Sequence, residues 1–245
     1  MPRQTTRAQR RREARRAEAA RPAKGSRRGG GISRGWVIGA SVVAVAAVAV
    51  LIWASNASST TPPVTTVPPG ITQSGQTRGD PAAPVTIDEW ADFQCPACGV
   101  FARQTEPQIV STYVAKGQVK IAFHNFAFLG PESNWAAEAA LCAGEQGKFF
   151  EFHDRLFASQ AGENNGAFAK DKLKKMGTDL GLSPSFAACV DSGKYAQSVR
   201  DEQNVGQGKD VSRTPTLFVN GKKYEGAYSF DEMKKIIEPL LAGGR

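Results

Sequence analysis

Two cysteines placed directly after an apolar run are the feature that most constrains how this chain can fold. Residues 85–90, VTIDEW, have the β-branched and apolar content of a buried strand. Cys95 lies five positions after Trp90 and directly precedes Pro96, a residue that suits the first position of a helix. Cys98 lies one helical turn further on. The sequence therefore predicts a strand that leads into a helix whose N-terminus carries two thiols.

The rest of this region predicts a mixed α/β domain with helices inserted in mid-chain. The first helix is expected to break at Pro107, and alternating apolar residues in 118–128 predict a second strand. Residues 132–208 have a helical pattern. An Asn-Gly turn at 220–221 predicts a hairpin, and a Ser-x-x-Glu capping box at Ser229 predicts the start of a final helix.

The position of Cys95 at a helix N-terminus favours the thiolate. Free backbone N–H groups and the helix dipole lower a cysteine pKa there by one to several units from its usual value near 8.5. Cys98, one turn on, is close enough to form a disulfide with Cys95. The pair is typical of a nucleophile with a resolving partner, which exchange disulfides with a substrate through a mixed disulfide.

The charge of the chain is concentrated at its N-terminus. Residues 1–34 carry twelve Arg or Lys and two Glu, whereas residues 80–245 have a net charge of −3. No basic excess remains in the folded part to meet phosphates, so nucleic-acid binding by this domain is not expected. The basic tail, residues 1–35, has no hydrophobic period and cannot form a core.

An uncharged stretch of nineteen residues, 36–54, predicts a single transmembrane helix. Trp36 and Trp53 stand at its ends, and the basic residues before it place the N-terminus in the cytoplasm. A cleaved signal peptide is the alternative, although the apolar run exceeds the length of a usual signal core. Either way the domain is expected outside the cytoplasm. Residues 55–79, rich in Ser, Thr and Pro, are predicted to be a linker to a domain at 80–245.

The other two cysteines are expected to form a structural disulfide. Four cysteines permit three pairings, but the local pair Cys95–Cys98 leaves Cys142 and Cys189 to each other. Both lie in helical stretches forty-seven positions apart. In the chain-entropy model a bridge across such a loop stabilises the fold by about 4 kcal/mol.

At this point the sequence resembles a known family. Residues 80 to 242 are similar to DsbA-like thiol–disulfide oxidoreductases with a thioredoxin fold and a helical insertion. The resemblance lies in the segments DPAAPVTIDEWADFQCPAC, EAALCAGEQGKFFEFHDRLF, SGKYAQSV and RTPTLFVNG. A C-x-x-C motif alone is a weak signal; its combination with TPT before a hairpin is specific.

The resemblance implies roles for three further residues and one partner. Pro215 matches the family's cis-proline, which lies against the active-site disulfide. The backbone of Thr214 is implied to pair with an extended substrate segment. Glu89, six positions before Cys95, matches a buried acid that exchanges a proton with the thiol of Cys98. The family also implies an integral-membrane partner that reoxidises the pair.

These observations predict an extracytoplasmic, membrane-anchored enzyme that donates disulfides to reduced exported polypeptides without a cofactor. Ala97 departs from the histidine that strongly oxidising members carry, so a less oxidising pair is expected, and an isomerase or reductase is the first alternative. A structural disulfide or half of a zinc site is the plainer interpretation of Cys95 and Cys98. At the level of the whole protein, a metal-binding chaperone and a non-catalytic scaffold are the remaining alternatives.

Overall fold

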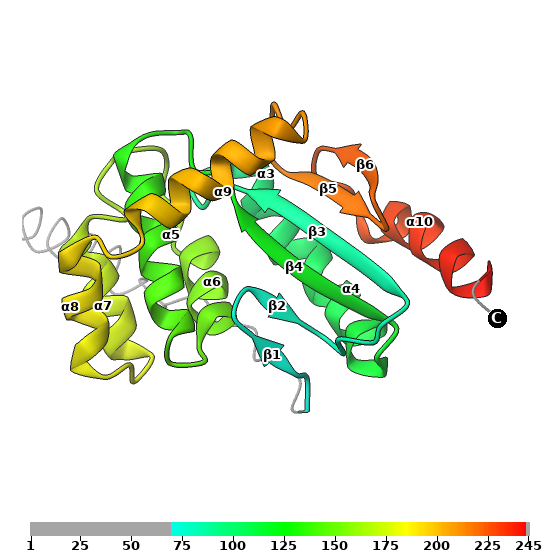
Figure 1. Ribbon diagram of the computed structural model, residues 1–245, viewed down its shortest axis with the longest axis horizontal. Helices are drawn as coiled ribbons and strands as arrows, with labels where there is room; N and C mark the ends of the chain where they lie inside the picture. The colour runs from blue at the N-terminus through cyan, green and yellow to red at the C-terminus, as the bar shows by residue number, and fades with distance from the viewer. Residues whose placement is uncertain (1–69, 244–245) are drawn as a thin grey trace, which may run out of the picture. The chain divides into compact units, whose positions relative to one another are not determined.

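The computed structural model describes residues 70–243, which fold around one six-stranded mixed sheet (Figure 1). The strand order is β1-β2-β4-β3-β5-β6. In chain order the strands are β1 (Gln73–Ser74), β2 (Thr77–Arg78), β3 (Val85–Ala91), β4 (Val119–Asn125), β5 (Thr216–Val219) and β6 (Lys222–Glu225). The helices are α3 (Pro96–Val100), α4 (Glu106–Thr112), α5 (Pro131–Gly144), α6 (Phe149–Ala158), α7 (Lys170–Asp179), α8 (Pro184–Ser192), α9 (Ala196–Gly208) and α10 (Phe230–Gly243).

The centre of the sheet has the pairing pattern of a thioredoxin fold. β3 is parallel to β4 and antiparallel to β5, so Ile87 stands beside Ile121 on one side and Val219 on the other. These fully buried side chains share one face of the sheet with Ile109 of α4 and Ile237 of α10. Burial of this face is the main force that holds the helix after β3 against the sheet.

The helix that begins at Pro96 is not broken at Pro107, in contrast to the sequence prediction. It continues from α3 through a π-helical segment, Phe101–Thr105, into α4. Pro107 lies in the first turn of α4, where its missing N–H is accommodated by the wider π-helical turn before it.

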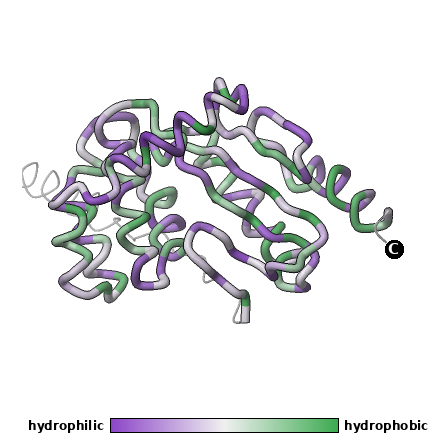
Figure 2. Tube along the Cα trace, viewed as in Figure 1, coloured by the Kyte–Doolittle hydropathy of each residue, from purple (hydrophilic) through white to green (hydrophobic). Residues whose placement is uncertain are grey.

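Helices α5 to α9 form the insertion between β4 and β5 (Figure 1). The insertion has its own apolar core, rich in phenylalanine and alanine, and this core also contains Cys95 and Cys98. Helix α9 returns across the ends of β3 and β4; its trace is largely hydrophilic in Figure 2 because only a narrow side of it meets the sheet. Gly206 makes this approach possible, since a Cβ there would lie 2.8 Å from atoms of Trp90 and Phe126.

The structure corrects one sequence prediction about the ends of the domain and confirms another. Residues 73–78, which the sequence assigned to the linker, form β1 and β2 and extend the sheet beside β4. Each strand has only two residues, too few for a periodic signal. The capping box at α10 is confirmed: Ser229 N donates to Glu232 Oε2 (2.8 Å), and Glu232 N donates to Ser229 Oγ (3.4 Å).

The predicted transmembrane helix, residues 36–54, lies outside the described residues. Within residues 70–243, no helix combines the length and the apolar character needed to span a bilayer.

Candidate active site

Cys95 occupies the N-cap of the helix that follows β3. Its backbone is extended (φ −66°, ψ 121°) and Pro96 takes the first helical position. The chain turns just before it, where Cys95 N donates to Asp92 O (3.0 Å), and Gly99 N donates to Cys95 O (3.0 Å) as the first helical hydrogen bond. Its sulfur therefore lies where the unpaired N–H groups of the first turn point.

The pKa of Cys95 is lowered to about 6. The first cause is a hydrogen bond from the thiol of Cys98; the side chain of Thr214 and the backbone N–H groups of Cys98 and Ala97 add to it, and burial opposes them. The thiolate therefore predominates at neutral pH, which makes Cys95 both a nucleophile and a good leaving group.

Cys98 has the opposite environment. It is fully buried, and burial is the first cause that raises its pKa well above the usual value, with the neighbouring Cys95 sulfur as the next. Both cysteines are free thiols in this structure. Cys95 keeps 8% of its surface exposed and Cys98 none, and a thiolate beside a neutral thiol is the arrangement of an attacking sulfur with a resolving partner.

Residues from the far end of the domain complete the site. The Thr214–Pro215 peptide bond is cis, and the Cys95 thiol donates to the Thr214 carbonyl oxygen (Sγ···O 3.4 Å). Pro215 O accepts from Gly226 N (2.8 Å), which ties this loop to the hairpin of β5 and β6. The structure thus brings Thr214 and Pro215 to the redox pair across 119 positions of sequence.

Glu89 lies on β3 and is fully buried, but it makes no hydrogen bond to Cys98. Burial is the first cause that raises its pKa well above the usual value, and Glu106 adds to the rise, whereas Arg78 opposes it. Arg78 forms a buried ion pair with Glu106, and its guanidinium lies over the ring of Phe150 (4.4 Å). The contact that direct proton transfer between Glu89 and Cys98 would need is therefore not present in this structure.

The buried carboxylate of Asp92 organises the loop before Cys95, and the sequence analysis missed it. Its Oδ1 accepts from Gln94 N (2.8 Å) and Ser133 Oγ (2.6 Å), and its Oδ2 accepts from Phe128 N (2.9 Å) and Leu129 N (3.1 Å). These contacts join the active-site loop to α5 and to the segment before it. No local pattern signals them, because the donors lie up to 41 positions away.

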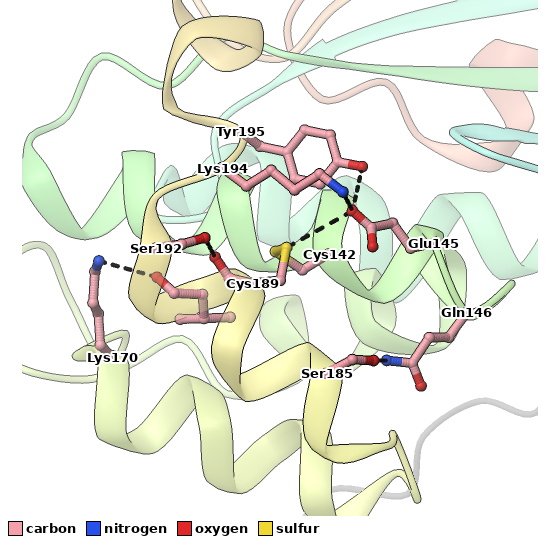
Figure 3. The surroundings of a disulfide bond; sticks show 10 residues. Cys142, Glu145, Gln146, Lys170, Ser185, Cys189, Ser192, Lys194 and Tyr195 are labelled. Atoms are coloured by element: carbon pink, nitrogen blue, oxygen red, sulfur yellow. Dashed lines mark hydrogen bonds and ion pairs between the residues drawn. A yellow bond between two sulfur atoms is a disulfide. The ribbon is translucent and has the colours of Figure 1, made fainter.

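Cys142 and Cys189 are joined by a disulfide between α5 and α8. Figure 3 shows its surroundings: the carboxylate of Glu145 accepts from Tyr195 Oη (2.7 Å) and pairs with Lys194 (2.5 Å) next to the bridge. Within residues 70–243, no group of three or more His, Cys, Asp or Glu side chains is arranged so that it could hold a metal ion.

Comparison with known proteins agrees with this geometry. The model of the Thioredoxin family matches residues 72–239. Disulfide bond formation protein D of Bacillus subtilis (strain 168) is 31% identical over 176 residues, which are 67% of this chain and 76% of that relative.

Solved structures show the same fold. The crystal structure of oxidised BdbD from Bacillus subtilis superposes with a TM-score of 0.65 at 29% identity, covering 69% of this chain and 94% of that one. The crystal structure of α-DsbA1 from Wolbachia pipientis shares the fold at 21% identity, with a TM-score of 0.63 over 71% of this chain and 92% of that one. The chain therefore belongs to the thioredoxin family, as a DsbA-like thiol–disulfide oxidoreductase.

Proposed function

We propose that this protein donates disulfide bonds to reduced polypeptides outside the cytoplasm through Cys95 and Cys98. The observation that carries the proposal is the contrast between the two sulfurs: the pKa of Cys95 is lowered to about 6, while that of Cys98 is raised well above its usual value. A stabilised thiolate favours the reduced form of the enzyme, and an enzyme whose reduced form is stabilised is an oxidant.

The cycle begins with the enzyme disulfide. A substrate thiolate attacks Sγ of Cys95, which breaks the Cys95–Cys98 bond, and Cys98 leaves and takes up a proton. The second substrate thiolate then attacks the substrate sulfur of the mixed disulfide and expels Cys95 as a thiolate. Two electrons pass from the substrate to the enzyme, which ends with a thiolate at Cys95 and a thiol at Cys98, and the protons of the two substrate thiols are released when those thiols ionise. Glu89, held protonated by burial, supplies the proton to Cys98 through a water.

Thr214 and Pro215 are the proposed substrate-binding residues. They lie beside Cys95, and an extended substrate segment placed along Thr214 would present its sulfur to Sγ of Cys95. A reoxidising partner in the membrane, which must accept two electrons from the reduced pair, would also react at Cys95, the less buried of the two sulfurs.

A trapping experiment tests the proposal. In a Cys98→Ala variant the Cys95 thiolate can still attack a disulfide of a bound chain and expel one of its sulfurs, but no second enzyme thiol remains to release that chain. Mixed disulfides are therefore expected to accumulate on Cys95, whereas a Cys95→Ala variant is expected to trap none. Trapping in intact cells, followed by identification of the bound chains, is expected to yield exported polypeptides and an integral-membrane protein. Failure to trap any chain while the wild type is active would contradict the order of attack.

The second candidate function is that of an isomerase or reductase with a less oxidising cysteine pair, because Ala97 places no ionisable side chain between the two cysteines. The thiolate of Cys95 depends instead on Cys98, Thr214 and backbone N–H groups. The redox potential separates the candidates. A value of about −120 mV would identify a disulfide donor, and a value of about −270 mV would identify a reductant.

We also propose that residues 36–54 anchor the protein in the membrane, with the basic tail in the cytoplasm and a linker before the domain. The proposal rests on the length of the uncharged stretch, its terminal tryptophans and the basic residues before it. The full-length product is expected in the membrane fraction after alkaline extraction, and its domain is expected to be digested by protease added outside the cell membrane. A product shortened by about fifty residues and free of the membrane would favour a cleaved signal peptide.

A further inference from the structure

The side chain of Gln160 connects the helical insertion to the backbone on both sides of the reactive cysteine. Gln160 follows α6, and its Nε2 donates to Phe93 O (2.7 Å) and to Cys95 O (3.0 Å). These two carbonyls bracket the turn that leads into the first helix. One amide group therefore fixes the turn from a position 65 residues further along the chain.

Arg103 sets the orientation of this amide. Its Nη1 donates to Gln160 Oε1 (3.0 Å) and to Phe157 O (2.6 Å), next to the end of α6. A flipped amide would place the NH2 group against the guanidinium and the oxygen against two carbonyls. Only one orientation is compatible with all the partners, so the donors of Gln160 point at the active-site loop.

Gly99 provides the space that the amide occupies. It is buried directly after Cys98, and a Cβ at this position would overlap Oε1 of Gln160 and lie 2.6 Å from Nη1 of Arg103. Its backbone is helical, so no left-handed conformation calls for glycine here. Glycine inside a helix is less favourable than alanine, so its presence here has another cause. Gly99 therefore leaves room for the amide of Gln160, and Arg103 orients that amide.

We propose that Gln160 is a positioning residue for the redox pair, which holds the carbonyls of Phe93 and Cys95 so that the Cys95 sulfur faces the N–H groups of the first helical turn. The inference rests on the proposed role of Cys95 as the attacking and leaving sulfur. Gln160 touches neither sulfur in the described structure and acts through the backbone alone.

The contact is expected to matter more for one redox state than for the other. A thiolate gains free energy from the N–H groups of Ala97 and Cys98 only when its sulfur lies in line with them, whereas a neutral disulfide sulfur gains little from the same groups. Loosening the turn therefore weakens the reduced form more than the oxidised form. The helical insertion would thus contribute to oxidising strength without contacting the sulfurs.

Two substitutions test this from opposite sides. Gln160→Met keeps the length of the side chain and removes its donors, and Gly99→Ala displaces the amide without changing Gln160 itself. Gln108→Met is the matched control, because Gln108 is exposed on α4 and its amide donates to Gln104 O (2.7 Å) within its own helix. The measurements are the thiolate titration of Cys95 in the reduced protein and the equilibrium constant of the protein with glutathione.

Both Gln160→Met and Gly99→Ala are expected to raise the pKa of Cys95 and to shift the equilibrium toward the protein disulfide by about two- to tenfold, the effect of one lost hydrogen bond. Gln108→Met is expected to change neither quantity. Equal losses of thermal stability in the oxidised and reduced forms, with an unchanged pKa and equilibrium constant, would show a purely structural role and overturn the inference. An ordinary pKa for Cys95 in the wild type would instead overturn the proposed function.

Discussion

Cys95 and Cys98 are the same chemical group three positions apart, and their surroundings give them opposite preferences. Cys95 lies at the open end of the helix and receives hydrogen bonds, whereas Cys98 lies one turn inside and has lost its contact with water. Each sulfur depends on the other, because the thiol of Cys98 is the first cause of the lowered pKa of Cys95. A substitution of Cys98 is therefore expected to alter the chemistry of Cys95.

Replacing Cys98 tests this dependence. Cys98→Ala removes the donor and is expected to raise the pKa of Cys95 from about 6 toward the usual value near 8.5. Cys98→Ser retains a hydroxyl donor and is expected to keep the pKa closer to that of the wild type. The rate of alkylation by iodoacetamide, measured across pH, reports both values; equal curves for the two variants would contradict the role of the hydrogen bond.

The lowered pKa also gives the stability of the reduced domain a pH dependence. The folded state holds its proton less tightly than the unfolded state, so this stabilisation is fully present above the usual cysteine pKa and is lost as pH falls through about 6. The oxidised domain has no titrating sulfur at Cys95. The unfolding free energy of the reduced form is therefore expected to fall relative to that of the oxidised form on acidification, as urea titrations of both forms would measure.

Glu89 has a pH dependence of the opposite sign. Burial raises its pKa well above the usual value, so its stabilising contribution is present below the usual glutamate pKa and is lost as pH rises through the folded value. Because glutamine does not ionise, the Glu89→Gln variant does not lose stability in this way as pH rises. The variant is expected to gain stability relative to the wild type as pH rises above the usual glutamate pKa, measured by urea unfolding. A difference that stays constant as pH rises above that value would contradict the raised pKa.

The same variant tests the proposed proton donor. If Glu89 protonates Cys98 as it leaves, Glu89→Gln is expected to slow the attack of a substrate thiol on the enzyme disulfide, while substrate affinity stays unchanged. Stopped-flow oxidation of a model peptide separates the two quantities. An unchanged rate alongside increased stability would assign Glu89 a purely electrostatic role in the fold.

At the scale of elements, the active site depends on how helices from the insertion approach the sheet. Helix α9 comes close to Trp90 of β3 through Gly206, and the chain then leads directly into the loop of Thr214 and Pro215. The loop of Thr214 and Pro215 is thus positioned by a helix that the insertion supplies. The close approach requires a residue without a side chain at one point of the helix.

Two glycines in α9 make a matched pair for testing this packing. Gly206→Ala would place a Cβ 2.8 Å from Trp90 and Phe126, and the overpacking is expected to cost about 1–3 kcal/mol in the free energy of unfolding. Gly208→Ala meets no atom within 4 Å and is expected to be neutral or slightly stabilising, since alanine favours a helix. Urea unfolding measures both; a similar loss in the two variants would point to backbone conformation instead of contact.

At the scale of the whole domain, the insertion is a helical unit fastened to a thioredoxin fold. The Cys142–Cys189 bridge closes a loop of 47 positions between α5 and α8. The redox pair shares its apolar core with this unit, and hydrogen bonds from Ser133 and Gln160 hold the active-site loop against it. Stability and reactivity are therefore linked through the same contacts.

Removing the second disulfide separates the two properties. The double variant Cys142→Ala, Cys189→Ala is expected to lose about 2–4 kcal/mol of unfolding free energy, because its unfolded chain gains freedom. The pKa of Cys95 is expected to stay near about 6, since no cause of its shift lies at that bridge. Urea unfolding and thiolate titration of one preparation would test both, and a raised pKa would show that the bridge supports the active site.

The sequence by itself determined the local features: a thiol pair at the start of a helix, the TPT motif before an Asn-Gly hairpin, the capping box at Ser229 and the pairing of the remaining cysteines. Each depends on residues a few positions apart or on the counting of a rare residue type. Only the tertiary structure decided the surroundings of Glu89, the four donors around Asp92, the two-residue strands and the position of Gln160. These depend on contacts between residues far apart in the chain, and burial and hydrogen bonding between distant segments leave no periodic trace in sequence.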